Sequence, residues 1–211
     1  MALDPGGSGG GAGGEFQSPA LEQLVRSLQQ LPGLGRKSAT RIALHLLADR
    51  DHAGRLTAAV AEALARVAHC SRCGAITETD PCHICTSPSR EAAVLCVVAS
   101  PVDILPFEKA AFFRGRYFVL GGLLSPLDGV RAEDLPFDRL VRRIDEDGVT
   151  EVILALDTSV EGETTSLYLQ RLLGQRDIAL SRLATGIPVG GALAYTDEAT
   201  LQRAFQHRTG F

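Results

Sequence analysis

The sequence has no apolar run long enough to cross a lipid bilayer, and this absence excludes a helical membrane-spanning protein. Its first residues also lack the charged and then apolar order of a secretory signal. The chain contains no internal repeat. Together these absences predict a protein that folds and acts in the cytoplasm.

The chain also lacks the excess of positive charge that marks a protein coating nucleic acid in general. Its net charge is -4 and its pI is about 5.7. The charge is unevenly spread: residues 18–90 hold nine Lys and Arg against six Asp and Glu, whereas residues 91–211 hold twelve against seventeen. A phosphate-binding surface is therefore expected in the first half of the chain.

What the sequence does contain is typical of a globular protein with one medium domain or two small ones. Its 211 residues are 45% hydrophobic and 22% charged, which is enough apolar material for a packed core. Residues 1–17 are rich in glycine and predict a flexible leader, either native or a linker. Apolar residues then recur at helical spacing over residues 19–30, 36–48 and 55–68.

After residue 92 the pattern changes, and short apolar runs alternate with helical stretches. The runs cover residues 94–98, 117–120, 151–156 and 178–184, and helical patterns fall near 102–112, 134–146 and 160–173. Strands that alternate with helices predict a parallel sheet with right-handed crossovers. The predicted fold class is a multi-part α/β protein in which a helical region precedes the sheet.

The segment from Leu31 to Ala39 reads Leu-Pro-Gly-Leu-Gly-Arg-Lys-Ser-Ala and resembles the helix-hairpin-helix element of DNA-repair proteins. Two glycines allow a sharp turn, and the helix that follows presents free N–H groups to which a phosphate can bind. Lys37 and Arg41 are four residues apart and share one helix face, and Arg36 lies at the turn. These three residues predict a site that contacts the DNA backbone, whatever the base sequence. The alternative is a plain helical hairpin with a solvated basic face.

Four of the five cysteines form two CxxC pairs, Cys70 with Cys73 and Cys82 with Cys85. Each pair can turn both sulfur atoms toward one ion, and two pairs complete a tetrahedron. The spacing therefore predicts one structural Zn²⁺ per chain, with no coordination position left open for catalysis. The alternative is a set of four ordinary buried thiols. Cys96 lies inside an apolar run and is interpreted as a small buried hydrophobic residue.

The segment Glu151–Glu163 reads EVILALDTSVEGE and resembles the Toprim domain of topoisomerases, primases and small nucleases. That family holds magnesium with a glutamate after its first strand and an Asp-x-Asp after a later strand. Here Ala99 stands at the position of the glutamate and Ser159 at that of the second aspartate, so no catalysis is expected. The acidic residues of this degenerate site are Asp157, Glu161 and Glu163. Weak residual metal binding and a purely structural role for them both stay open.

The order of a helix-hairpin-helix, a four-cysteine finger and a degenerate Toprim domain resembles the RecR family of recombination mediators over residues 18–211. The resemblance implies a non-catalytic scaffold of recombinational DNA repair that forms dimers and ring-like tetramers around DNA. It also implies that RecO and RecF are partners in loading RecA onto gapped or single-stranded DNA. In this scheme Lys37 and Arg41 contact DNA and the Toprim domain is a docking surface for RecO.

The resemblance also divides the chain into parts. They are a leader at 1–17, a helix-hairpin-helix region at 18–69, a zinc finger at 70–85, a Toprim domain at 93–188 and an assembly segment at 189–211. Two rival functions remain. The first is a Toprim nuclease or primase-like enzyme, and Ala99 and Ser159 argue against it. The second is a zinc module that binds only protein, and the segment Gly33–Arg41 argues against it.

Overall fold

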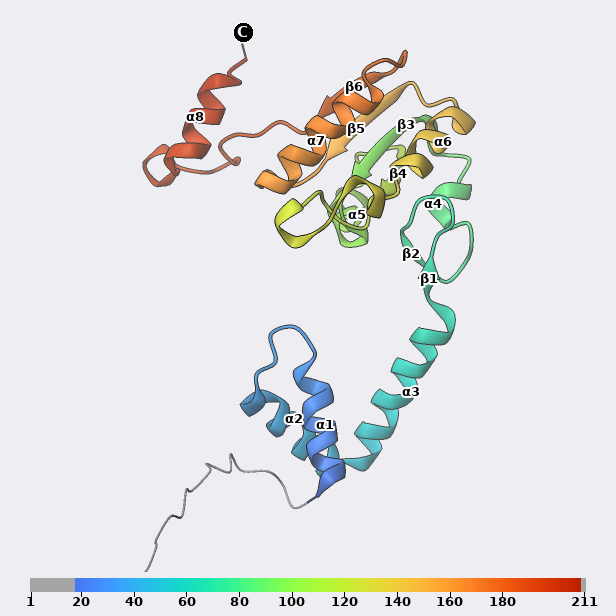
Figure 1. Ribbon diagram of the computed structural model, residues 1–211, viewed down its shortest axis with the longest axis vertical. Helices are drawn as coiled ribbons and strands as arrows, with labels where there is room; N and C mark the ends of the chain where they lie inside the picture. Colours follow the sequence, from blue (N-terminus) through green and yellow to red (C-terminus); the bar gives the residue numbers. More distant parts are fainter. Residues whose placement is uncertain (1–17, 210–211) are drawn as a thin grey trace, which may run out of the picture. The chain divides into compact units, whose positions relative to one another are not determined.

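The structure is a computed structural model that describes residues 18–209, so the leader predicted for residues 1–17 lies outside the described residues. The chain forms two compact units, of which the first ends at Ala65 and the second begins at Arg66. Figure 1 traces their elements in chain order. Over the described range, every helix is too short or too polar to cross a membrane.

The first unit is a small helical assembly. Its helices are α1 (Pro19–Gln29), α2 (Arg36–Ala48) and α3 (Arg50–Arg66), the last of which reaches the boundary between the units. Val25 of α1 packs against Ala39 and Ala43 of α2, and all three side chains are fully buried. Because alanine is small, the two helices can approach each other closely around the single valine.

The third helix begins earlier than the apolar pattern indicates. The pattern predicts a start near residue 55, whereas α3 begins at Arg50. The reason is local: the Asp49 carboxylate accepts a hydrogen bond from the His52 N–H at 2.8 Å and so caps a polar first turn that has no apolar periodicity. The helix ends at Arg66, and the first strand of the chain begins at Ala68.

The second unit is built on a four-stranded parallel sheet with the order β4-β3-β5-β6, which confirms the predicted fold class. The strands are β3 (Glu91–Val98), β4 (Gly115–Val119), β5 (Glu151–Ala155) and β6 (Ala179–Arg182). The helices that connect them in turn are α5 (Ile104–Ala110), α6 (Phe137–Asp147) and α7 (Val160–Leu173). The unit also contains the short 3-10 turns η1 (Pro101–Asp103), η2 (Pro126–Asp128), η3 (Ala132–Asp134) and η4 (Leu193–Tyr195) and a last helix α8 (Glu198–Gln206).

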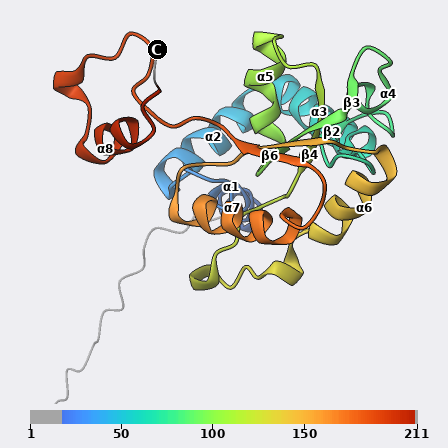
Figure 2. The same ribbon diagram turned by 90° about the horizontal axis from the view of Figure 1, so that it is seen from above.

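The two faces of the sheet have different coverings. Figure 2 shows α5 on one face and α6 and α7 on the other. The pleat sends alternate side chains of β3 to opposite faces. Leu95 and Val97 therefore join the apolar cluster formed with α6 and α7, whereas Cys96 and Val98 belong to a second cluster with α5 and the four-cysteine segment.

The four-cysteine segment is a small finger that lies against the edge of this sheet. It contains β1 (Ala68–His69), β2 (Ile76–Thr77) and the short helix α4 (His83–Thr86), with β1 and β2 antiparallel. The backbone N–H of Val119 in β4 donates a hydrogen bond to the Cys73 carbonyl at 2.7 Å. The finger therefore satisfies part of an edge strand whose N–H and C=O groups would otherwise lack partners.

Candidate metal centre and nucleic-acid interface

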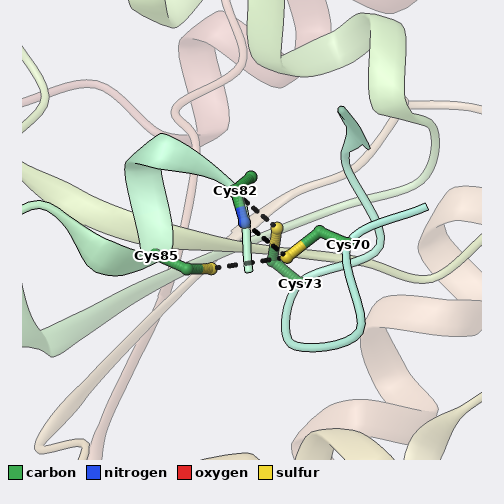
Figure 3. A group of neighbouring side chains, drawn as sticks. All are labelled: Cys70, Cys73, Cys82 and Cys85. Atoms are coloured by element: carbon green, nitrogen blue, oxygen red, sulfur yellow. Dashed lines mark hydrogen bonds between the residues drawn. The ribbon is translucent and has the colours of Figure 1, made fainter. Parts of the chain in front are cut away.

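The four cysteines of the two CxxC pairs come together at one point between the finger loops, as Figure 3 shows. Their sulfur atoms all lie within 4.8 Å of one another, and all four side chains are buried. Two backbone N–H groups point at sulfur atoms: that of Ala75 lies 3.4 Å from Cys73 Sγ, and that of Cys82 lies 3.3 Å from Cys70 Sγ. Such N–H contacts stabilise sulfur in its thiolate form.

The arrangement fits a four-sulfur zinc centre. Zinc bonds to thiolate sulfur are about 2.3 Å long, so the edge of a regular tetrahedron of sulfur atoms is about 3.8 Å. The sulfur atoms of Cys73 and Cys82 are 3.6 Å apart and those of Cys70 and Cys85 are 4.0 Å apart. Four thiolates complete the coordination shell, so the chemistry this donor set supports is structural, with the ion holding the finger in its fold.

The surroundings of the Cys85 and Cys96 thiols act on their pKa values in opposite directions. Interaction with the Cys73 thiol, followed by the Arg143 guanidinium, lowers the pKa of Cys85 to about 5. Burial alone raises the pKa of Cys96 to about 12, and Cys96 does not belong to the sulfur cluster. Cys96 therefore packs as a small hydrophobic residue in the apolar cluster beside the finger.

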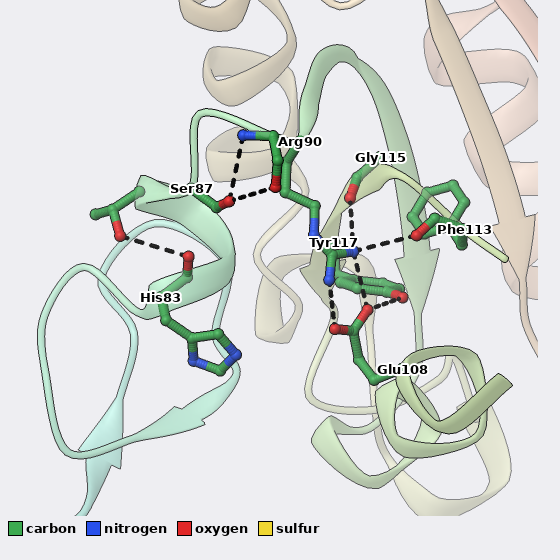
Figure 4. A network of polar contacts seen from close by, with 9 residues as sticks. His83, Ser87, Arg90, Glu108, Phe113, Gly115 and Tyr117 are labelled. Carbon is green, nitrogen blue, oxygen red and sulfur yellow. Dashed lines mark hydrogen bonds and ion pairs between the residues drawn. The ribbon is translucent and has the colours of Figure 1, made fainter. Parts of the chain in front are cut away.

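The segment that leaves the finger is held to the sheet by a half-buried polar network, drawn in Figure 4. Arg90 donates to Glu108 of α5 with both terminal nitrogens, the longer bond being 2.9 Å, and the Tyr117 hydroxyl donates to the same carboxylate at 2.7 Å. Burial acts to raise the pKa of Glu108, but the hydrogen bonds from Arg90 and Tyr117 outweigh it and lower the pKa. The network therefore keeps a charged carboxylate at the junction of the finger and the sheet.

Two of the predicted DNA-binding residues lie at the start of α2. Gly33 has a φ of +78°, in the left-handed region that side chains disfavour, and this residue turns the chain out of α1. Gly35 then occupies the cap position of α2, and no side chain caps the N–H groups of the first turn. Lys37 and Arg41 follow on the helix with exposed side chains. Within residues 18–209, neither forms an ion pair with a carboxylate.

The third predicted residue, Arg36, has a structural partner. Its two terminal nitrogens donate to the two carboxylate oxygens of Glu22 in α1, at 3.0 and 3.2 Å. The Glu22 side chain is only 9% exposed, and the hydrogen bond from Arg36 is the main cause that lowers its pKa. Arg36 therefore joins the two helices of the hairpin, and a role for it in contacting DNA stays a prediction.

The structure does not bring the acidic residues of the Toprim-like segment together into a metal site. Asp157 is exposed beyond the end of β5, and Glu161 and Glu163 lie in the first turn of α7. The Ser159 hydroxyl, at the position of the family's second aspartate, caps α7 by accepting a hydrogen bond from the Gly162 N–H at 3.1 Å. In the part of the chain described, the four cysteines are the only group of three or more potential ligands within reach of one ion.

One of these acids is already neutralised within the fold. Glu163 accepts a hydrogen bond from Arg182 of β6 at 2.8 Å and forms an ion pair with Arg203 of α8 at 3.5 Å. The adjacent Gly162 permits a tight approach of the chain, because a Cβ atom there would lie 1.9 Å from the carbonyl oxygen of Asp157. Glu163 therefore connects the helix to the last strand and the C-terminal segment.

Two buried charged side chains of α6, those of Arg143 and Asp147, lie beside the finger and were not predicted from the sequence. The Nη2 atom of Arg143 lies 3.8 Å from Cys85 Sγ, and its Nε atom donates to Asp147 at 2.6 Å. The signal in the sequence was an arginine on the apolar stripe of α6, next to Leu140 and Ile144. An arginine at this position indicates that a charge is buried, but it does not indicate which residue pairs with that charge.

Comparison with protein families assigns every part of this architecture to a known group. The helical unit matches the RecR helix-hairpin-helix family over residues 21–64, and the finger matches the RecR four-cysteine zinc finger domain over residues 67–87. The sheet matches the Toprim domain over residues 93–184, and the last segment matches the RecR C-terminal family over residues 186–209. The finger match agrees with the sulfur geometry, and together they support one structural zinc ion.

Several relatives resemble the chain over nearly its whole length. The Recombination protein RecR of Halorhodospira halophila is 47% identical over 195 residues, which cover 92% of this chain and 97% of that protein. The protein of the same name from Chlorobium phaeovibrioides is 48% identical and covers 93% of this chain and 99% of its own length. That of Syntrophobacter fumaroxidans is 47% identical, with coverages of 92% and 96%.

Proposed function

The chain belongs to the RecR family of recombination proteins, and from this membership we propose that it is a non-catalytic scaffold that holds DNA during recombinational repair. The observation that carries the proposal is the start of α2, where exposed Lys37 and Arg41 stand beside N–H groups that no side chain caps. Helix N–H groups and lysine or arginine side chains are donors that suit phosphate oxygens.

The chemistry of this surface favours binding to the DNA backbone. Phosphates repeat along any DNA, so contacts to them hold the strand without selecting a base sequence. The segment from Leu31 to Arg41 contains no acidic residue, and the nearby Glu22 carboxylate is already paired with Arg36. Arg36, whose guanidinium is held by Glu22 but whose side chain is 46% exposed, shapes the hairpin and is proposed as a third contact to phosphate.

The Toprim-like sheet then acts as a support and docking surface. Metal-dependent phosphoryl transfer needs carboxylates that converge on the ion. The residue after β3 is Ala99, the residue that caps α7 is Ser159, and Glu163 is occupied by two arginines. These features favour a scaffold over the alternative of a nuclease or primase-like enzyme.

We expect the purified protein not to cleave DNA in the presence of magnesium. The measurement is incubation of labelled single-stranded, gapped and duplex DNA with the protein and Mg²⁺, followed by denaturing electrophoresis. Asp157→Ala is the control that separates a contaminant from the protein, since this exposed residue is the first candidate ligand after β5. Cleavage by the parent that disappears in Asp157→Ala would show that the sheet carries an active site.

Self-assembly is the second part of the proposal. In the described part of the first unit, three residues form the buried apolar core, while several large apolar side chains of α2 and α3 are exposed: Leu44, Leu47, Leu56, Val60 and Leu64. A unit with so small a core gains stability when such side chains are covered by another copy. This supports dimers and ring-like tetramers, to which the C-terminal segment also contributes. Converging basic patches would let an acidic protein hold DNA.

The remaining parts of the proposal follow from the family. The chain works with RecO and RecF proteins in the cytoplasm to promote loading of RecA on gapped or single-stranded DNA, and its Toprim domain is the surface on which RecO docks. The sheet unit has an ordered apolar core and carries several charged residues at its surface. Such a surface is compatible with binding another protein.

The mass of the assembly with and without DNA tests the scaffold directly. We expect particle masses at even multiples of the 22.4 kDa chain in sedimentation-velocity ultracentrifugation over a range of concentrations, with the largest assembly enriched when DNA is added. The reason is that DNA binds a ring through several convergent sites and therefore stabilises it by mass action. A chain that binds DNA while remaining a monomer at every concentration would contradict the proposal.

A further inference from the structure

The helix α6 directs a row of charged side chains at the zinc finger. Arg139, Arg143 and Asp147 are spaced four residues apart, so they share one face of the helix. Arg139 stacks on the ring of Phe118, 5.1 Å from its centroid. One turn further, Arg143 is buried, with 4% of its side chain exposed, and contacts the sulfur of Cys85.

Asp147 holds Arg143 in this position, and its carboxylate also binds other arginines. Its side chain is 7% exposed and forms ion pairs with three arginines. One is Arg143, one is Arg116 of β4 at 3.3 Å, and the third is Arg72, which lies between the ligands Cys70 and Cys73 in the finger. The carboxylate therefore connects the helix, the edge strand and the first CxxC pair.

The charges of this group are unequal. Three guanidinium groups surround a single carboxylate, which leaves a positive excess beside the finger. Of the three, only Arg143 is buried, whereas the Arg72 side chain is 35% exposed. The Nη1 atom of Arg143 is buried and has no hydrogen-bond partner among the described residues. A buried cation with an unsatisfied donor is destabilising unless negative charge lies nearby.

A four-cysteine zinc centre supplies the missing negative charge. Four thiolates around one Zn²⁺ carry a formal charge of about -2, which matches the positive excess of three arginines over one aspartate. Groups that hydrogen-bond to metal ligands stabilise the deprotonated ligands and so strengthen the binding of the ion. Arg143 is placed to do this because it contacts a ligand sulfur directly.

We propose that Arg143, oriented by Asp147, is a positioning residue of the zinc centre whose positive charge stabilises the four thiolates and so holds the ion. Arg143 binds no metal itself, and its effect passes through Cys85. The inference concerns the metal centre alone and does not depend on DNA binding.

The test compares variants that separate charge from hydrogen bonding. Arg143→Gln retains an N–H donor but removes the charge, whereas Arg143→Lys retains the charge. Arg142→Gln is the matched control, because it removes the same charge from an exposed position of the same helix. Zinc affinity of the full chain is measured by competition with a chromogenic chelator, and circular dichroism checks that each variant is folded.

We expect Arg143→Gln to bind zinc about 10- to 100-fold more weakly, and Arg143→Lys and Arg142→Gln to bind it nearly as tightly as the parent. With Co²⁺ in place of Zn²⁺, the sulfur-to-metal charge-transfer band should move to longer wavelength in Arg143→Gln only, because its sulfur electrons are no longer stabilised by the cation. The inference is overturned if Arg143→Gln retains parental zinc affinity, or if Arg143→Lys or Arg142→Gln weakens binding as much. If Arg143→Gln does not fold, the zinc affinity and the Co²⁺ spectrum of Arg143→Lys become the test. Parental values support the inference, and a loss of zinc affinity of about tenfold overturns it.

Discussion

Cys73→Ser is expected to release the zinc ion, unfold the finger and lower the yield of soluble protein. Zinc binding in small fingers contributes about 10–16 kcal/mol, as much as the whole stability of a typical domain. The loss spreads beyond the finger, because its cysteines share one apolar cluster with the β3 and β4 side chains Val98 and Tyr117. The hydrogen bond from Val119 to the Cys73 carbonyl, which covers the edge of β4, would also be lost.

The measurements are zinc content by elemental analysis and thermal unfolding with and without a chelator. Cys96→Ala is the matched control, because it removes a buried thiol from the same cluster but not from the sulfur group. It should retain one zinc ion per chain and lose only a modest part of the stability. A parent protein that is well folded without zinc, or a Cys73→Ser protein that keeps both zinc and the parental melting temperature, would refute the structural role of the centre.

The double variant Lys37→Ala/Arg41→Ala is expected to lose nearly all DNA binding while remaining folded. Both side chains are exposed on α2 and have no ion-pair partner in residues 18–209, so their removal leaves no buried charge behind. Each phosphate contact that is lost should reduce the slope of log K against log salt by about 0.7–0.9. In a ring every subunit loses the same contacts, so the combined loss should be on the order of 100-fold or more.

Fluorescence anisotropy on two unrelated DNA sequences over a range of salt concentrations measures this effect, and the loss should be equal on both. Arg171→Ala/Arg203→Ala removes the same charge from the acidic second unit and should have a much smaller effect, although Arg203 also loses its ion pair with Glu163. If the double variant of α2 were folded, assembled and still bound DNA like the parent, the hairpin would not be the contact surface. Arg26 would then be the first residue to test.

The features that the sequence alone determined are those whose physics is local. Two CxxC pairs predicted the sulfur cluster, because a short segment can turn two sulfurs to one ion whatever surrounds it. The alternation of apolar runs and helical patterns predicted the parallel sheet, because the periods of strands and helices differ. The glycines before Arg36 predicted the turn into α2, where Gly33 has the left-handed backbone that few other residues adopt.

Tertiary structure alone decided which charges meet. Arg36 is paired with Glu22, 14 residues away, and this gives it a structural partner that the basic pattern around it did not indicate. Arg143 contacts Cys85, 58 residues away, and Arg72 meets Asp147 across 75 residues. Periodicity places a residue on a face of its own helix, but the partner of that face depends on how the chain returns through the crossovers of the sheet. The chain contains many arginines and carboxylates. Only the packing of α6 against β4 and the finger determines that Arg143 meets Cys85 and that Arg72 meets Asp147.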